Sequence, residues 1–214
     1  SEDSTLSFNK RVLTPHPVAR YIKVSKDLLR KSTLSVEGIV RERLAYKFAT
    51  VEETAFMTGG GGGEPLGLFT ASAMGISTDR DVSTDNTTTT LTTDGLINCK
   101  YKLESQWLSS PNLRWVFHRD VVAHIRKLKD GNGQYIWSPG LAADRVDTIL
   151  EVPVVMSEYA PNTFTSTYYL GIIGDLSYFW IVDQLGMQVQ RLQELYALTN
   201  QDAFVGRLAC DAMP

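Results

Sequence analysis

The chain has 214 residues, of which 21 are Lys or Arg and 24 are Asp or Glu, so its formal net charge is −3. Hydrophobic residues make up 43% and charged residues 21%, which excludes a disordered protein, a collagen and a coiled-coil rod. Without a positive excess the chain has no global field to hold nucleic acid. Its longest apolar stretches, near residues 170–173 and 178–182, fall far short of the roughly 18 residues that span a bilayer, so no membrane partner is expected.

The charge is spread unevenly along the chain. Residues 1–50 carry ten basic and five acidic side chains, a balance of +5, and the remainder carries −8. This split favours head-to-tail contact between identical chains. A chance fluctuation in the charges of a solvated surface accounts for it equally well.

The N-terminal quarter predicts extended structure followed by two helices. Residues 4–13 alternate in character, and the two prolines at 15 and 17 favour an edge strand or a protruding ribbon. Residues 20–24 alternate again, and Ser25 is expected to cap a short helix through Leu29 with Asp27 in its first turn.

The strongest periodic pattern predicts one long helix over residues 35–57. Apolar residues recur at intervals of three and four along one face, and Ser35 is a favourable N-cap. Glu37 and Arg41 can pair on another face, and the glycines from Gly59 onward end the helix. At ~1.5 Å per residue, this helix is roughly 35 Å long.

The glycine run from Gly59 to Gly63 invites comparison with a phosphate-binding loop. That loop needs Lys and Ser or Thr after its last glycine and follows a strand, whereas Glu64 and Pro65 follow here and a helix precedes. A flexible turn is therefore the favoured interpretation.

The middle of the chain predicts a polar surface loop over residues 77–93 and then an amphipathic helix. Asp94 is expected to cap that helix. Its inner side would carry Leu96, Cys99, Leu103 and Trp107. Cys99 and Cys210 form neither a disulfide framework nor a zinc spacing, and they suit a reducing compartment.

The rest of the chain predicts short strands around one further helix at residues 118–129. Turns are expected at residues 130–133, 174–175 and 183–186. The expected strands are residues 114–117, 147–156, 167–173, 178–183, 187–192 and 202–209. Because helices and strands mix without regular alternation, the predicted class is α+β.

A search for reactive groups finds one cluster of histidines and a carboxylate, at His118, Asp120 and His124. The two histidines are six residues apart and point to different sides of a helix, so His118 is better interpreted as a helix N-cap. Glu52 and Glu53 are adjacent on a helix and diverge by about 100°. No catalytic residue, metal ligand or cofactor site is predicted, and the chain is not expected to be an enzyme or to bind a small-molecule substrate.

Several segments in order resemble the major capsid protein family of tailed phages, which has the HK97 fold. The similar segments are VSKDLL at residues 24–29, ETAFM at 53–57 with EPLGL at 64–68, WVF at 115–117, LKDGNGQYIW at 128–137, VPVV at 152–155 with Ser157, and GD at 174–175 with Tyr178, IVD at 181–183 and Gly186. None is specific alone, but together they cover almost the whole chain.

The resemblance implies a domain organisation. Residues 1–24 would be part of an extended loop that reaches a neighbouring subunit. Residues 25–75 and 184–214 would form a peripheral domain around the spine helix, residues 35–57. Residues 76–183 would form an axial domain. It also implies that the family's N-terminal arm and last strand lie outside this sequence.

The resemblance further implies a function. The chain would be a structural subunit of an icosahedral phage or prophage capsid, self-assembling into pentamers and hexamers in the host cytoplasm. The virion shell would enclose DNA without sequence-specific binding. Two alternatives stay open from the residues: an encapsulin-type compartment, and a small nucleotide-binding enzyme that uses the glycine run. The candidate interface residues, on the basic loop, are Lys10, Arg11, Arg20 and Lys23.

Overall fold

The structure is a computed structural model, and it describes residues 10–83, 91–137, 147–165 and 168–214. Contacts within the chain define two compact units. Unit 1 comprises residues 1–47 and 181–212, and unit 2 comprises residues 48–180 and 213–214. The predicted loop, peripheral and axial domains stay a prediction. No helix among the described residues is long and apolar enough to cross a membrane.

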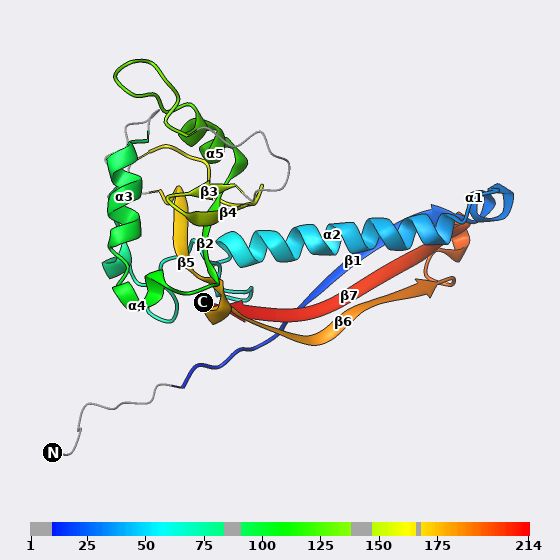
Figure 1. Ribbon diagram of the computed structural model, residues 1–214. Coiled ribbons are helices and arrows are strands. Elements are labelled where there is room, and N and C mark those ends of the chain that lie inside the picture. Colours follow the sequence, from blue (N-terminus) through cyan, green and yellow to red (C-terminus); the bar gives the residue numbers. More distant parts are fainter. Residues whose placement is uncertain (1–9, 84–90, 138–146, 166–167) are drawn as a thin grey trace. The chain divides into compact units, whose positions relative to one another are not determined.

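Unit 1 is built on a sheet of three long strands in the order β1-β7-β6 (Figure 1). Its elements are β1 (His16–Ser25), α1 (Lys26–Lys31), the first half of α2 (Val36–Thr58), nearly all of β6 (Trp180–Leu192), the 3-10 turn η3 (Ala197–Thr199) and nearly all of β7 (Gln201–Met213). β1 pairs antiparallel with β7 over ten residues, from His16 opposite Cys210 to Ser25 opposite Gln201. β1, with Pro17 in it, is an edge strand, as the prolines predicted.

The local predictions for the two N-terminal helices are confirmed. The Ser25 hydroxyl accepts a hydrogen bond from the backbone N–H of Asp27 at the start of α1. The Ser35 hydroxyl does the same for Gly38 at the start of α2, and Glu37 pairs with Arg41 at 2.7 Å. Val40 and Leu44 are buried, as the periodic pattern predicts.

One prediction in unit 1 is wrong. Residues 183–186 were expected to form a hairpin turn between two strands, but β6 is continuous from Trp180 to Leu192. Asp183 and Gly186 are turn-forming residues, yet β6 runs alongside β7, and this long pairing overrides the local preference. The connection over residues 193–200 is too short for a parallel crossover, so β6 and β7 form the hairpin instead.

Unit 2 contains a four-stranded sheet in the order β3-β4-β2-β5, with helices beside it. β2 pairs parallel with β4 and antiparallel with β5. Its elements are the second half of α2, η1 (Thr78–Arg80), α3 (Thr93–Tyr101), α4 (Ser105–Leu108), β2 (Leu113–Phe117), α5 (Arg119–Arg126), β3 (Thr148–Ile149), β4 (Val152–Met156), β5 (Gly171–Asp175) and η2 (Leu176–Tyr178).

The core of unit 2 centres on β2. Trp115 is 1% exposed, stacks on Phe117 with ring centroids 5.3 Å apart, and donates its indole N–H to the carbonyl of Ile149 at 3.1 Å. Val121 and Ile125 of α5 belong to the same buried cluster. The apolar side predicted for this helix is therefore confirmed, although the helix ends at Arg126, three residues earlier than expected.

Two predicted elements of unit 2 are each split in the structure. The strand expected over residues 147–156 is a hairpin of β3 and β4, because Leu150 and Glu151 both have positive φ, at 49° and 70°. The helix expected to start at Asp94 is two helices, α3 capped by the hydroxyl of Thr92 and the short α4 after Glu104.

The remaining predictions for unit 2 differ at their ends. β5 begins at Gly171, so the strand expected from residue 167 is shorter, and residue 167 lies outside the described residues. Residues 174–175 end β5 instead of forming a separate turn, and Asp175 caps η2 through the N–H of Ser177. Residues 84–90 of the predicted surface loop also lie outside the described part of the chain.

Candidate subunit interface

The four candidate interface residues lie in two structural settings. Lys10 and Arg11 are exposed in the irregular segment before β1, and Arg20 and Lys23 are exposed on β1 itself. Successive side chains of a strand point to opposite faces, so Arg20 and Lys23, three positions apart, face opposite sides of the sheet. The structure therefore does not bring the four together into a single basic patch.

Lys23 is also engaged within its own unit. Its ammonium lies 4.0 Å from the ring centroid of Tyr196, in the connection between β6 and β7, and 5.8 Å from that of Tyr21. A cation held over an aromatic face keeps its charge but loses some freedom to reach outward. Lys23 therefore has a structural role beside any role in assembly.

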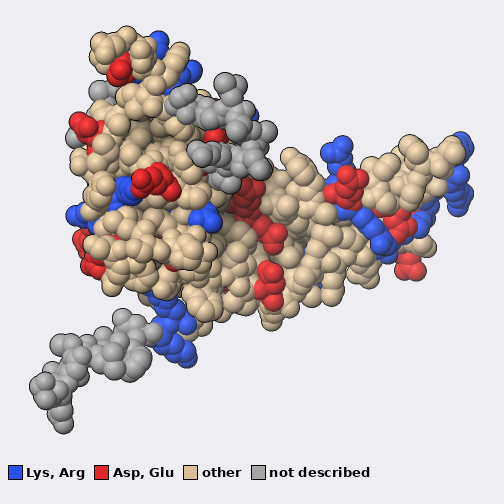
Figure 2. All heavy atoms as spheres, in the orientation of Figure 1, with Lys and Arg blue, Asp and Glu red and all other residues tan. Residues whose placement is uncertain are grey.

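The start of the described chain is attached to unit 1 by Asp211. This buried carboxylate accepts a hydrogen bond from the backbone N–H of Thr14 at 2.6 Å. Lys10 and Arg11 therefore lie within four residues of Thr14, which this hydrogen bond holds to β7. Basic side chains at this end of the described chain are visible in Figure 2.

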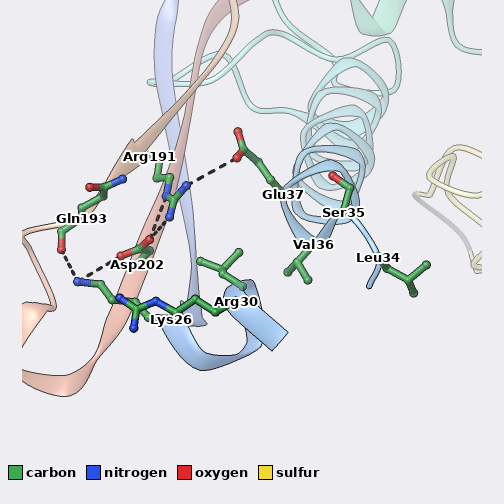
Figure 3. Close-up of a pocket in the computed structure, with 10 residues that line it drawn as sticks. Lys26, Arg30, Leu34, Ser35, Val36, Glu37, Arg191, Gln193 and Asp202 are labelled. Carbon is green, nitrogen blue, oxygen red and sulfur yellow. Dashed lines mark hydrogen bonds and ion pairs between the residues drawn. The ribbon is translucent and has the colours of Figure 1, made fainter. Parts of the chain in front are cut away.

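A second polar site, which the sequence analysis did not predict, is a hollow of about 390 Å³ at the end of unit 1 that carries α1. Three cations and two anions line it, together with aliphatic side chains (Figure 3). The charged residues are Lys26, Arg30, Glu37, Arg191 and Asp202.

Asp202 organises these charges. Its side chain is 1% exposed, and Oδ2 accepts hydrogen bonds from Nε and Nη2 of Arg191 at 2.9 and 2.6 Å. Lys26 Nζ lies 3.6 Å from Oδ1, which accepts no hydrogen bond from the described residues. Arg191 in turn lies 3.9 Å from Glu37. The network ties β7, β6 and both N-terminal helices together.

Replacing Asp202 by Ala is expected to lower the free energy of unfolding by about 2 kcal/mol. Removing one member of a buried pair costs about 3 to 5 kcal/mol, but Arg191 is partly exposed and water compensates part of that loss. Urea unfolding of the unassembled chain measures the change. Glu37→Ala is the matched control, because that carboxylate is partly exposed and should cost about 0.5 kcal/mol. Equal effects of the two variants would contradict the central role of Asp202.

The glycine run does not have the form of a phosphate site. The backbone N–H of Gly60 donates to the Glu64 carboxylate at 2.8 Å, so an anion already occupies a donor that a phosphate would need. A Cβ at Gly59 would lie 2.2 Å from the carbonyl oxygen of Pro65, so this glycine permits a close chain approach at the end of α2. The interpretation as a turn is supported, and the nucleotide-enzyme alternative loses its structural basis.

The histidine cluster is likewise structural. His118 is buried, and its Nδ1 accepts the backbone N–H of Asp120 at 3.0 Å, the predicted N-cap of α5. His124 packs against Phe164 with ring centroids 4.5 Å apart. Each histidine has its own partner, and neither is directed toward a shared ligand position.

Asp175, predicted in a turn, is held as an anion. Hydrogen bonds from the hydroxyls of Ser110 and Ser177 lower the pKa of its carboxyl group below the ordinary value. A carboxyl group of lowered pKa is a poor general acid near neutral pH. Its environment therefore fits the role of a cap.

Comparison with known proteins identifies the fold. Over its whole length, residues 1–214, the chain matches the family described as the phage capsid family. No curated protein matches it in sequence.

Solved structures agree with that match. The "Capsid of empty GTA particle computed with C5 symmetry" aligns with a TM-score of 0.79 at 22% identity, covering 100% of this chain and 75% of that one. The capsid of the native GTA particle aligns with a TM-score of 0.76 at 21% identity, covering 99% and 75%. A structure from Mycobacterium phage Adephagia aligns with a TM-score of 0.66 at 14% identity, covering 99% and 71%. At these identities the structures establish a shared fold, and with the match of the full sequence they show that the chain belongs to the phage capsid family.

Proposed function

We propose that copies of this chain assemble as pentamers and hexamers into an icosahedral shell that encloses viral DNA. As a member of the phage capsid family, the chain is a structural capsid subunit. The observation that carries the proposal is that one family covers every residue from 1 to 214, while the fold matches capsid chains over the same length. Assembly would take place in the cytoplasm of the bacterial host.

The charge distribution supports contact between copies. The first 50 residues carry +5 and the remainder carries −8, so the start of one copy is attracted to the rest of another. Each exposed ion pair contributes at most about 1 kcal/mol, and a shell adds many such contacts.

The same charge distribution supports an enclosing role toward DNA. A chain with net charge −3 has no overall attraction to phosphate, and affinity for duplex DNA depends on neutralising phosphates. We therefore infer confinement of the DNA by the shell, without readout of its sequence. The encapsulin-type alternative has no observation in its favour beyond the shared fold.

Electron microscopy of the full-length gene product after expression tests the proposal. Closed shells of uniform size are the expected result. Shells formed beside phage packaging proteins should hold DNA, whereas copurification of an enzyme inside them would favour the encapsulin alternative. A product that stays monomeric at high protein concentration, with its fold intact, would contradict the proposed assembly.

Charge reversal at Lys10, Arg11 and Lys23, each to Glu, is expected to reduce the yield of shells at least tenfold. The three changes turn attraction toward an acidic neighbour into repulsion. Raising the salt to about 1 M should also lower the yield of shells from the parent, because the Debye length falls to about 3 Å and exposed charges are screened. Sedimentation of assembled and free subunits measures the yield.

Three exposed basic residues of unit 2 provide the control. Reversal at Arg80, Lys102 and Lys127 makes the same change in net charge without altering the basic segment. If both triple variants assembled like the parent, the basic segment would not be the interface.

A further inference from the structure

An exposed turn of unit 2, residues 130–134, contains the one Asn-Gly pair of the sequence, Asn132 followed by Gly133. The turn follows α5 and is closed by an isolated antiparallel bridge between Lys129 and Tyr135. An asparagine is thermally labile where the next backbone nitrogen can reach its side-chain carbonyl carbon, because the two then close a five-membered ring. The turn therefore brings together the two groups of a covalent reaction.

Gly133 removes the usual obstacle to this ring closure. It has no side chain to shield its nitrogen, and with its φ at +80° a Cβ built there would have no neighbouring atom within 4 Å. The side-chain amide of Asn132 makes no hydrogen bond with any residue in the described ranges, so it is free to turn toward that nitrogen. The other asparagines in the described ranges are each followed by a residue with a side chain. They are Asn98, Asn112, Asn162 and Asn200.

Asp130 holds the turn closed against this reaction. Its Oδ1 accepts the backbone N–H of Asn132 at 2.9 Å and that of Gln134 at 2.8 Å. Its carbonyl accepts the N–H of Gly133 at 3.0 Å, so the nitrogen that must attack is engaged as a donor while the turn is closed. All these residues are exposed, and exposed turns open locally at little cost in free energy. Asp130 thus controls how often the Gly133 nitrogen becomes available.

We propose that Asn132 is a site of spontaneous deamidation through a succinimide. The backbone nitrogen of Gly133 attacks Cγ of Asn132 and forms a C–N bond. The bond from Cγ to Nδ2 breaks, and Nδ2 leaves as ammonia with the proton that the attacking nitrogen gives up. Water then opens the succinimide at either carbonyl carbon and returns a proton to the nitrogen, which yields aspartate or isoaspartate. Water is the only co-reactant, and nothing is oxidised or reduced.

Either product changes the turn. Each adds one negative charge, so the formal net charge of the chain goes from −3 to −4 and a second carboxylate lies close to that of Asp130. Isoaspartate also routes the backbone through the former side chain, which adds a methylene group between Asp130 and Gln134. The hydrogen bonds that close the turn then no longer match the length of the chain. The pair is therefore a slow, irreversible switch from a closed to an open turn, separate from the proposed assembly.

Incubation of the full-length protein in mildly alkaline buffer, followed by peptide mass spectrometry, tests the proposal. The mass gain of deamidation at residue 132 is expected to appear about tenfold faster or more than at the other four described asparagines in the same sample. Fragmentation assigns the gain to one residue, and isomerisation of Asp130 does not interfere because it leaves the mass unchanged. This comparison needs no variant, and equal rates at all five asparagines would overturn the proposal.

Three variants test the route and its control by Asp130, with circular dichroism to show that each is folded. Gly133→Ala should slow the conversion about tenfold, because the new Cβ shields the attacking nitrogen. Gly131→Ala is the matched control, since it adds the same methyl group, with no atom within 4 Å, on the other side of Asn132 and should leave the rate within about twofold. Asp130→Ala should raise the rate about threefold or more, because it removes two hydrogen bonds that close the turn.

Two results would contradict the proposal. If Gly133→Ala converted as fast as the parent, attack by the backbone nitrogen would be wrong. If Asp130→Ala converted no faster than the parent, Asp130 would not control the opening of the turn.

Discussion

Trp115→Ala is expected to lower the free energy of unfolding of unit 2 by about 4 kcal/mol, the upper part of the range for large core side chains. The indole is 1% exposed, stacks on Phe117 and donates a hydrogen bond to Ile149. Its removal leaves a cavity beneath β2 and an unpaired carbonyl at Ile149, and both costs add. Chemical unfolding of the unassembled chain, followed by circular dichroism, measures the loss.

Trp107→Ala is the control for that change. Trp107 is 37% exposed and makes an edge contact with Tyr178 at 5.4 Å between ring centroids. Its loss should cost about 1 kcal/mol. If the two tryptophans gave similar shifts of the unfolding midpoint, the buried cluster around β2 would not be the main source of stability in unit 2.

Gly171→Ala is expected to destabilise unit 2 by about 3 kcal/mol, although it adds one methyl group. Gly171 lies opposite Phe117 in the β2–β5 pair, and a Cβ there would lie 2.0 Å from Cε1 of the Phe117 ring. That ring cannot move aside freely, because it is buried and stacked on Trp115. Overpacking a rigid core typically costs about 1 to 3 kcal/mol.

Gly174→Ala on the same strand is the matched control. A Cβ at Gly174 would have no atom within 4 Å, so the change should be neutral or slightly stabilising. The double variant G171A/F117L should recover part of the lost stability, since the two changes share one contact. A small effect of Gly171→Ala, equal to that of Gly174→Ala, would show that the ring has room to shift.

Features set by neighbouring residues could be predicted from the sequence. The long helix was predicted to within one residue at each end, because Ser35 caps it, apolar residues mark one face and Gly59 ends it. The cap at His118 and the pair of Glu37 with Arg41 follow from spacings of two and four residues. Each of these interactions closes within one turn of a helix.

Features set by distant pairing could not be predicted in this way. Leu150 and Glu151 are not typical turn residues, yet both adopt positive φ where β3 turns back onto β4. Asp183 and Gly186 are typical turn residues, yet they lie inside a strand that runs alongside β7. In both cases the pairing partner outweighs the local preference.

The candidate interface shows the same division. The basic segment was visible in composition, but its pattern did not reveal that Arg20 and Lys23 face opposite sides of β1 or that Lys23 lies over Tyr196. The hollow around Asp202 was not predicted at all, because its charged residues belong to α1, α2, β6 and β7, which only the folded chain brings together.

The sequence by itself determined the α+β class, the helices with their caps, the edge character of β1 and the ordered segments that place the chain in its family. Tertiary structure alone decided which strands pair, which glycine lies against the core, and how Asp202 gathers charges from β6, α1 and α2. The physical reason is the separation along the chain over which each interaction acts. Caps, helical periodicity and proline geometry act between residues a few positions apart, whereas burial and strand pairing depend on side chains that only the folded chain brings together.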